Sequence, residues 1–334
     1  MTVPVLEVRD LHVDVPTRRG LLHAVRGVSF TVSPGEALGL VGESGCGKSL
    51  TLRAVLDLLP HPAEIVGGQV LVDGVDVTAL DRGARRKAIS SAVSMVFQDP
   101  MTALNPMMRI VNQIAEAPQV CLGFSRPAAR ERALELMRQV GIPDPERRAR
   151  AYPHELSGGL RQRVVIAIAL SCAPKLLLCD EPTTALDVTI QAQVLELLRG
   201  LRRHSDLAML LVTHDLAVVS ETCDRLAVMY AGRIVEDGPI GQLVLDPQHP
   251  YTFSLLRSVP DPELVRQRLL TIAGSPPDLV EAVSGCPFAA RCPFVEDDCT
   301  AGEPALMDLS TGRHSACRHV RSTEAWSAEV EVHA

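Results

Sequence analysis

The segment "GESGCGKS", residues 42–49, has the glycine, lysine and serine spacing of a loop that binds nucleotide phosphates. Its glycines let consecutive backbone N–H groups curl around phosphate oxygens, and a following helix adds the positive end of its dipole. The lysine brings positive charge to the β- and γ-phosphates, and the serine offers a hydroxyl ligand to Mg²⁺. The alternative is a glycine-rich turn without a ligand, but an apolar run before the loop and a helical pattern after it favour phosphate binding. The predicted phosphate-binding residues are Gly42, Glu43, Ser44, Gly45, Cys46 (through its N–H, not as a nucleophile), Gly47, Lys48 and Ser49.

Two acidic residues close the apolar run "LLLCDE". Asp180 is placed to support Mg²⁺, and Glu181 is placed to orient or deprotonate an attacking water molecule. A strand that simply ends in solvated acids is the alternative, and it is common for such a pair in isolation. The pair therefore predicts a hydrolytic site only together with the phosphate-binding loop.

Two further segments have residue types suited to anion binding. "LSGGLRQR", residues 156–163, puts a serine and two glycines at the start of a helix, which is an anion-binding geometry. A helix that is merely capped by Ser157 or the glycines is the alternative. "VTHD" places His214 at the end of a strand, where a lone histidine is more often structural than catalytic.

Four of the nine cysteines gather near the C-terminal end of the sequence, with the spacing C-x5-C-x6-C-x17-C. We call residues 285–317, which contain them, the cysteine segment. An even scatter would put roughly one cysteine in a window of this size. Disulfides, zinc, a [4Fe–4S] cluster and no metal are the alternatives. The four cysteines are Cys286, Cys292, Cys299 and Cys317.

The spacing bears on these alternatives. A reducing compartment disfavours disulfides. Structural zinc sites usually pair their cysteines as C-x₂₋₄-C, which this segment lacks, although His314 and His319 leave a mixed site open. A [4Fe–4S] cluster tolerates wider spacing, and cysteines followed by proline, as at Pro287 and Pro293, recur around such clusters.

The elements that must position these residues follow from apolar periodicity. Buried apolar strands that alternate with helices predict a mainly parallel α/β core, and the early alternating strands predict an antiparallel sheet beside it. The expected strands are 5–15, 23–32, 36–42, 67–74, 92–98, 175–181, 208–214, 225–230 and 232–238. The expected helices are 47–59, 187–204, 215–223 and 249–259. A helical region is expected from 99 to 165, with proline breaks at Pro106, Pro118, Pro127, Pro143, Pro145 and Pro153.

Composition sets the protein class. The 334 residues are 46% hydrophobic and 22% charged, which is ordinary for a soluble globular protein. The net charge of −7 argues against nucleic acid as the main partner. The sequence starts without the layout of a signal peptide, and its apolar runs fall short of the roughly 18 residues that cross a bilayer. We therefore expect a cytoplasmic location with reduced thiols.

In their order along the chain, "GESGCGKS", "VFQDP", "LSGG", "LLLCDE", "TTALD" and "VTHD" resemble the ATP-binding subunits of ABC transporters over residues 5–240. The resemblance implies a nucleotide-binding domain at 1–240, with a helical subdomain at 99–165, and a C-terminal extension at 241–334. It implies that Gln98 senses the γ-phosphate and Mg²⁺, that His214 holds the γ-phosphate and that Asp187 communicates across a dimer. Ser157, Gly158 and Gly159 would face the ATP held by the opposite subunit. The implied catalytic residues are Glu181, His214 and Gln98, and the implied Mg²⁺ ligands are Ser49, Gln98 and Asp180.

Four segments narrow the resemblance to the ATPases of oligopeptide and dipeptide permeases: "FQDPMTALNP", "YPHELSGGLRQR", "HPYTFSLL" and "GCPFAARCP". These bacterial importers use two different ATPase subunits, two transmembrane permease subunits and an external solute-binding protein. The resemblance implies ATP hydrolysis that energises import of peptides or related small solutes, at the cytoplasmic face of the membrane. It also implies a [4Fe–4S] cluster on the four cysteines, with a structural or redox-regulatory role.

One departure and two rival functions accompany this resemblance. The family stacks adenine on an aromatic residue near the end of the first strand, whereas "VDVPTRRGLLHAV" offers only His23 or Val15. A soluble ABC ATPase that acts on DNA or ribosomes is one rival, disfavoured by the single cassette and the lack of sustained heptads. A non-hydrolysing regulatory subunit is the other, disfavoured by the presence of both Glu181 and His214.

Overall fold

The computed structural model describes residues 3–184, 186–203, 205–258, 272–281, 283–309, 312–320 and 325–326, apart from the side chain of residue 100. The chain divides into two compact units. Unit 1 comprises Met1–Glu7, Thr31–Glu36 and Val70–Val212. Unit 2 comprises Val8–Phe30, Ala37–Gln69 and Thr213–Ala334.

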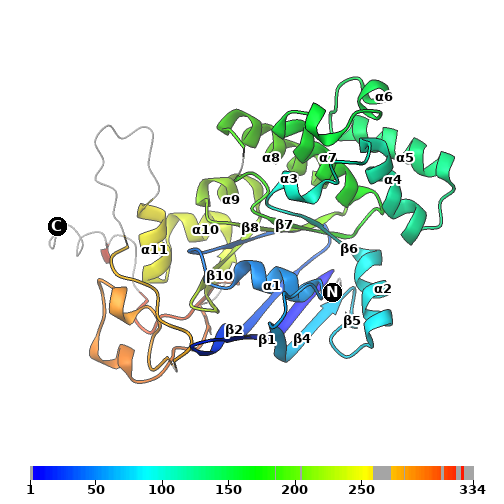
Figure 1. Ribbon diagram of the computed structural model, residues 1–334. Helices are drawn as coiled ribbons and strands as arrows, with labels where there is room; N and C mark the ends of the chain where they lie inside the picture. The colour runs from blue at the N-terminus through cyan, green and yellow to red at the C-terminus, as the bar shows by residue number, and fades with distance from the viewer. Residues whose placement is uncertain are drawn as a thin grey trace. The chain divides into compact units, whose positions relative to one another are not determined.

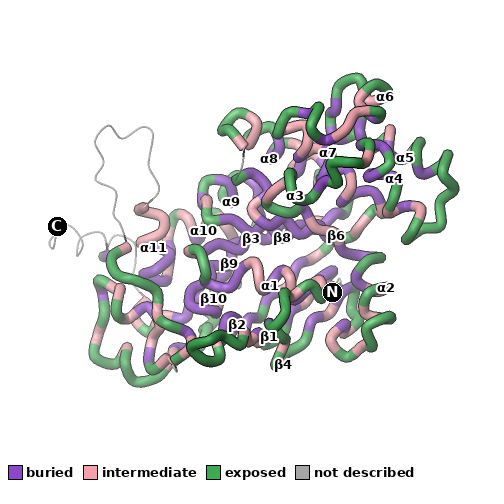
Figure 2. Tube along the Cα trace, in the orientation of Figure 1, coloured by how far each residue is buried: buried purple, intermediate pink, exposed green. Residues whose placement is uncertain are grey.

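Unit 1 contains a run of parallel strands in the order β6 (Val93–Val96), β7 (Leu176–Asp180) and β8 (Ala208–Thr213). Every residue of β7 and β8 is buried, as the continuous apolar runs predicted (Figure 2). Helix α8 (Val188–Arg203) buries a stripe of apolar side chains at helical spacing, namely Val194, Leu195, Leu198 and Leu201. The predicted parallel strands and the helix between β7 and β8 are confirmed.

Helices fill the stretch between β6 and β7 (Figure 1). They are α3 (Pro100–Ala103), α4 (Ile110–Cys121), α5 (Arg126–Gln139), α6 (Pro145–Arg148) and α7 (Gly158–Leu170). Ser125 caps α5 by accepting a hydrogen bond from the N–H of Ala128. The predicted break at Pro118 is wrong, because this residue lies inside α4. It stands close to the helix end at Cys121, where only one backbone hydrogen bond is lost.

Unit 2 contains two groups of strands. The first group, in the order β2-β1-β4, is β2 (Gly20–Val32), β1 (Leu6–Thr17) and β4 (Glu64–Val72), and most residues of these strands, though not their ends at 6–7, 31–32 and 70–72, belong to unit 2. The second group, in the order β3-β9-β10-β12-β11, is β3 (Ala37–Val41), β9 (Arg225–Tyr230), β10 (Arg233–Pro239), β12 (His314–Ser315) and β11 (Met307–Asp308). Strands β3 and β9 are parallel, whereas β10 is antiparallel to both β9 and β12. The C-terminal segment thus adds strands next to β10.

The C-terminal part of unit 2 also has helices α10 (Ile240–Leu245) and α11 (Pro250–Arg257). Three aromatic rings form a small core there: Phe253 on α11, Phe294 in the cysteine segment and Trp326. The ring centroids of Phe253 and Phe294 lie 5.4 Å and 5.5 Å from that of Trp326. Within the described part of the chain, no helix combines the length and apolar character needed to cross a membrane.

Several elements were not predicted from the sequence, namely α2 (Arg82–Ala92), β5 (Val75–Asp76), α10, β11 and β12. The start of α2 does have a local signal, since the carboxylate of Asp81 accepts hydrogen bonds from the N–H groups of Gly83 and Ala84. The helix predicted for 47–59 is shorter, because α1 spans Lys48–Val55. It is followed by Asp57 in a left-handed conformation with a φ of 56°.

Candidate functional site

The phosphate-binding loop, residues 42–49, connects β3 to α1 within unit 2. All five residues of β3 are buried, so the loop leaves a firmly packed strand end. Gly47 caps α1 with a φ of 110°, and a Cβ there would lie only 2.6 Å from the carbonyl oxygen of Ala24. Glycine is therefore required where the loop turns into the helix. The turn leaves the N-terminal N–H groups of an eight-residue helix at the loop.

Lys48 has the placement expected of a phosphate-binding lysine. Its side chain is buried, and its Nζ donates hydrogen bonds to the carbonyl oxygens of Gly42 at 2.7 Å and Glu43 at 2.9 Å. The loop's own carbonyls thus hold the ammonium group beside the N–H groups that would bind phosphate. Burial raises the pKa of the nearby Cys46 thiol, and the charge of Lys48 opposes this rise. A raised pKa keeps the thiol protonated, and a protonated thiol is a weak nucleophile.

The acidic turn of unit 1 follows β7. Asp180 ends the strand and is buried, while Glu181 has a φ of 47°. The Oε2 atom of Glu181 accepts hydrogen bonds from Nε2 of Gln98 at 3.1 Å and Oγ1 of Thr184 at 2.9 Å. A left-handed non-glycine residue costs roughly 1–2 kcal/mol, and such strain is typical of functional turns. The structure brings together Gln98 and Glu181, two of the three predicted catalytic residues.

The start of α7 carries the "LSGG" residues. Ser157 stands at the N-cap, but its hydroxyl does not cap the helix. Ser157 and Gly158 are exposed, and Gly159 is half-buried. The buried side chain of Gln162 donates from Nε2 to the carbonyl oxygen of Pro182 at 2.7 Å, and so fixes α7 against the turn after β7.

Asp187 and His214 lie at the ends of elements. Asp187 is exposed before α8, where its Oδ1 accepts a hydrogen bond from the N–H of Ile190 at 3.0 Å. His214 is exposed directly after β8. The next residue, Asp215, caps α9 (Leu216–Thr222) through hydrogen bonds from the N–H groups of Ala217 and Val218. These positions leave both predicted side chains at the surface of the described chain.

The four clustered cysteines line one cavity of unit 2. Cys286, Cys292 and Cys299 come from the turns around two short 3₁₀ helices, Ala289–Arg291 and Asp297–Thr300, whereas Cys317 follows β12. Phe288, Phe294 and the imidazole of His249 line the same cavity. The wide spacing in the sequence is therefore compatible with a single convergent site.

Each of the four sulfur atoms accepts a hydrogen bond from a backbone N–H. For three of them the donor is two residues further along, at Phe288, Phe294 and His319, and for Cys299 the donor is Glu296 at 3.5 Å. Such bonds stabilise thiolates and are typical of cysteines that hold a metal centre. The donor set thus fits a group bound by thiolates.

Burial raises the pKa of Cys292 to about 12 and that of Cys317 to about 11. The other cysteines of the cavity raise both values further, because neighbouring thiolates repel one another. A bound cation would remove this repulsion and allow the thiolates to form together.

A second ligand group shares one of these cysteines. Among the described residues, the group of metal-binding side chains whose donor atoms all lie within 4.8 Å of one another is Asp298, Cys299 and His319. No three of the four cysteine sulfurs meet this limit in the described structure. A tetrahedral zinc ion with Zn–S bonds of about 2.3 Å would require sulfur atoms only about 3.8 Å apart.

Two residues outside the predicted set contact the phosphate-binding loop. The N–H of Glu43 donates to Oη of Tyr251 at 2.8 Å, and the carboxylate of Glu43 pairs with the guanidinium of Arg291. Both residues lie in segments that carry the resemblance to peptide-permease ATPases, "HPYTFSLL" and "GCPFAARCP". The sequence around them did not predict a contact with the phosphate-binding loop. His23, one of the two residues considered for contact with adenine, has its Nδ1 atom 2.8 Å from Oδ1 of Asp14.

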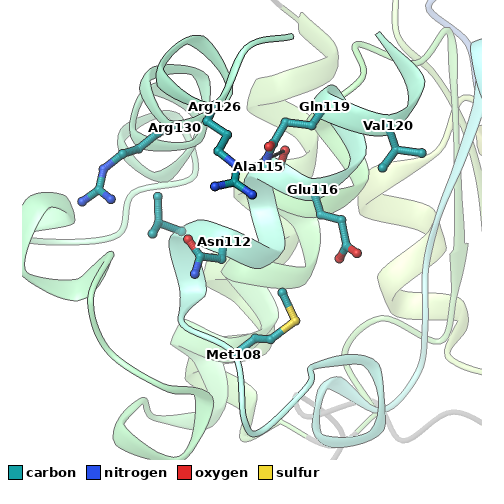
Figure 3. A pocket seen from close by; sticks show the side chains of 9 residues that line it. Met108, Asn112, Ala115, Glu116, Gln119, Val120, Arg126 and Arg130 are labelled. Carbon is teal, nitrogen blue, oxygen red and sulfur yellow. Dashed lines mark hydrogen bonds between the residues drawn. The ribbon is translucent and has the colours of Figure 1, made fainter. Parts of the chain in front are cut away.

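A hollow of about 490 Å³ lies on the helical part of unit 1 (Figure 3). One wall of the hollow is formed by residues of the α4 region, among them Met108, Asn112 and Glu116, and α5 contributes two arginines. The lining residues are Met108, Val111, Asn112, Ala115, Glu116, Gln119, Val120, Arg126 and Arg130. Val120, which lines the hollow, and the nearby Met107 are 77% and 83% exposed.

Family models match two parts of the chain. Residues 25–184 match the family described as ABC transporter. Residues 235–299 match the family described as oligopeptide/dipeptide transporter, C-terminal region. The second match includes Tyr251, Arg291 and three of the four clustered cysteines.

Curated relatives resemble the chain over nearly its whole length. It is 49% identical over 314 residues to a probable peptide ABC transporter ATP-binding protein, y4tR, of Sinorhizobium fredii, covering 93% of this chain and 94% of that protein. It is 50% identical over 290 residues to the dipeptide transport ATP-binding protein DppD of Bacillus subtilis, covering 86% and 87% of the two chains.

Solved structures share the fold. The dimeric structure of the ATP-binding cassette MJ0796, in a post-hydrolysis state bound to ADP and Pi, is 26% identical and has a TM-score of 0.63. It covers 70% of this chain and 98% of that one. The structure of cbiO1 from Clostridium perfringens, part of an ABC transporter complex, is 27% identical with a TM-score of 0.62, covering 72% and 90%. The predicted α/β fold with its antiparallel sheet is confirmed.

Proposed function

The chain belongs to the ATP-binding proteins of ABC transporters, and we propose that it hydrolyses ATP as one ATPase subunit of an importer for peptides or related small solutes. Identities of 49% and 50% to peptide and dipeptide transport ATP-binding proteins support the substrate class. The match of residues 235–299 to the oligopeptide/dipeptide transporter C-terminal region supports it independently. Neither rival function finds support in these relatives.

The phosphate-binding loop and the acidic turn supply complementary parts of the reaction. The loop N–H groups and Lys48 bind and neutralise the phosphates, while Glu181 orients the attacking water and accepts its proton. His214 would hold the γ-phosphate. The observation that carries this proposal is the carboxylate of Glu181, which Gln98 and Thr184 hold in one orientation through two hydrogen bonds.

Mg²⁺ would be held by Ser49, Gln98 and Asp180, three oxygen-bearing side chains that suit a hard cation. When bound, the ion withdraws charge from the β- and γ-phosphates. Asp180 is buried at the end of β7, directly before Glu181. Gln98 would connect this ion to the acidic turn through its hydrogen bond to Glu181.

The substitution Glu181→Gln tests this proposal in the assembled transporter. It keeps the shape of the side chain but removes the base, so ATP hydrolysis should fall at least about 100-fold while MgATP still binds. The matched control is Glu131→Gln, an exposed glutamate on α5. Hydrolysis at the parent rate in Glu181→Gln would show that the assigned mechanism is wrong.

The partners follow from the family and the surface. A second ATPase subunit of a different sequence would complete each nucleotide site, with Ser157, Gly158 and Gly159 facing the partner's ATP and Asp187 at the contact. Two features support this arrangement: the start of α7 is exposed, and the hydroxyl of Ser157 makes no capping hydrogen bond to the helix. Two transmembrane permease subunits and an external solute-binding protein would complete the importer, and this chain would lie at the cytoplasmic face of the membrane.

The hollow between α4 and α5 is the surface we assign to a permease subunit. Its mixture of exposed apolar side chains with Asn112, Glu116 and Arg126 suits a cytoplasmic helix or loop of that subunit. The variant Val120→Cys, made in a chain in which Cys121 is replaced by serine, should crosslink to the permease in membranes. A cysteine at the exposed Lys87 should not. Crosslinking at neither position would remove this assignment.

We also propose that Cys286, Cys292, Cys299 and Cys317 hold one [4Fe–4S] cluster. The cavity that the four cysteines share and the N–H bonds to all four sulfurs support this proposal. Nothing in ATP-driven import requires electrons, so the cluster would be structural or redox-regulatory. A zinc ion on Asp298, Cys299 and His319 is the second candidate, because their donor atoms are close together.

Metal analysis of anaerobically purified protein separates these candidates. About four irons and four acid-labile sulfides per chain, lost in Cys292→Ser and retained in Cys121→Ser, would support the cluster. The control removes an exposed cysteine outside the cavity. One zinc without iron, lost in His319→Ala, would replace the cluster with the second candidate. Protein without either metal would overturn both.

A further inference from the structure

Glu43, the second residue of the phosphate-binding loop, pairs with a residue 248 positions away. Nη1 of Arg291 donates to Oε2 of Glu43 at 2.7 Å, and Nη2 donates to Oε1 at 2.9 Å. This is a bidentate, charge-assisted contact, which is the strongest form of such a pair. The side chain of Arg291 is only 5% exposed, so solvent screens the pair weakly.

Arg291 is held in place from several sides. Its Nε donates to the carbonyl oxygen of Ala273 at 3.0 Å, and its Nη2 donates to that of Ile272 at 3.3 Å. Its Nη1 also contacts Oη of Tyr230 at 3.3 Å. Since these partners fix the guanidinium group, it presents a rigid positive fork to the loop. Arg291 itself lies between Cys286 and Cys292, within the cysteine segment.

A second contact holds the backbone of the same loop residue. The N–H of Glu43 donates to Oη of Tyr251, on α11, at 2.8 Å. The ring of Tyr251 packs against Tyr230 and Phe288, with centroids 4.6 Å and 5.4 Å away. Glu43 is thus fixed at both its backbone and its side chain by residues from the C-terminal part of unit 2.

The charge of Glu43 gives the pair a function beyond packing. A free carboxylate in a loop built for phosphates would repel the polyanionic ligand. Arg291 neutralises that carboxylate, and the two anchors reduce the motion of the loop before the ligand arrives. We propose that Arg291 and Tyr251 are positioning residues for ATP, so that the cysteine segment and α11 help to build the phosphate site. This inference rests on the proposed ATP binding, but not on which metal the cysteines hold.

The test is equilibrium binding of MgATP to the full-length chain at low salt. Arg291→Gln, which leaves the carboxylate unpaired in the loop, should raise Kd about tenfold. Adding Glu43→Gln removes the repelling charge, so the double variant should return to within about threefold of the parent. Tyr251→Phe, which keeps the ring and removes only the hydroxyl, should raise Kd about threefold.

The matched control is another ion pair of the C-terminal region that avoids the loop. Glu303 pairs with Arg26 at 2.7 Å and with Arg233 at 2.9 Å, and Glu303→Gln should bind MgATP like the parent. Parent affinity in a folded Arg291→Gln variant would overturn the proposal. So would a double variant no better than the single one, because that result would mean a packing defect. A parent chain that fails to bind MgATP would instead contradict the proposed function.

Discussion

Strands β3 and β7 are alike, but the turns that follow them have opposite chemistry. Each strand has five residues, all of them buried. The turn after β3 is built from glycines and presents N–H groups and an ammonium. The end of β7 and the turn after it carry two carboxylates, those of Asp180 and Glu181, and Glu181 has a left-handed conformation that glycine would adopt more easily.

The two turns place different demands on the conformation of their backbone. A loop that binds phosphate through N–H groups needs several residues in unusual conformations, and glycine supplies them at little cost. A turn that aims one carboxylate at water needs a side chain, and accepts strain at a single residue instead. The first turn should therefore govern affinity for ATP, and the second should govern the rate of hydrolysis.

Removal of the ammonium tests the first half of this comparison. Lys48→Ala should weaken MgATP binding about 100-fold, because a charged hydrogen-bond donor to phosphate is lost from a buried position. Lys87→Ala, at an exposed lysine on α2, is the matched control and should leave Kd unchanged. The measurement is calorimetric titration of the full-length chain. Parent affinity in Lys48→Ala would break the assignment of binding to this turn.

The backbone of the same turn can be tested without touching a charge. Gly47→Ala should lower the free energy of unfolding by about 2–3 kcal/mol, because the added Cβ would meet the carbonyl oxygen of Ala24 at 2.6 Å in a left-handed backbone. Gly200→Ala, in α8 with open space around its Cβ position, should instead raise it by up to about 1 kcal/mol. Urea unfolding of both variants measures the difference. Equal effects would show that the loop conformation is not the constraint.

Local patterns explain which parts of the molecule were predictable. The phosphate-binding loop and the acidic turn were found because their residues are contiguous and follow apolar runs, so a short segment determines the geometry. A role for Gln98 was implied only by the resemblance to a family, and its contact with Glu181, which joins residues 83 positions apart, was not predicted. Spacing alone did not indicate it.

Long-range pairing explains what was missed. Strands β11 and β12 have two residues each, and they exist because β12 pairs with the edge of β10 and β11 pairs with β12. The same holds for Arg291, whose contact with Glu43 depends on the fold of the whole C-terminal region. Helix α2 was missed for a different reason, since its buried residues are only Ile89 and Ala92, too few to form an apolar stripe.

The free energy by which His249 stabilises the surroundings of the first turn should depend on pH. Its Nδ1 accepts the N–H of Tyr251 at 3.1 Å, and burial lowers its pKa to about 3. The unfolded chain has a pKa near 6.5 there, so the neutral ring stabilises fully above pH 6.5 and loses this contribution as the pH falls toward 3. From pH 8 to pH 5.5 the loss should be about 1.4 kcal/mol. His249→Asn, which can still cap α11, should not show it.

The comparison of the two proteins at each pH isolates this effect. Burial raises the pKa of Glu236 to about 7, so its contribution runs the opposite way and grows as the pH falls from 7 to 4.5. It is present in both proteins and largely cancels in their difference. Urea unfolding at the two pH values should show His249→Asn gaining about 1.4 kcal/mol relative to the parent at the lower pH. A difference independent of pH would remove His249 from the support of the loop.

The smallest effect is expected at the second turn, where Thr184 donates to Oε2 of Glu181 at 2.9 Å. Thr184→Val keeps the side-chain shape and leaves Gln98 as the donor to that oxygen, so the carboxylate should be less well oriented but still present. Hydrolysis in the assembled transporter should fall about threefold, with the KM for ATP unchanged. Thr189→Val, at an exposed position on α8, is the control. A raised KM with an unchanged kcat would contradict the assignment of binding to the first turn and hydrolysis to the second, because the acidic turn would then be contributing to binding.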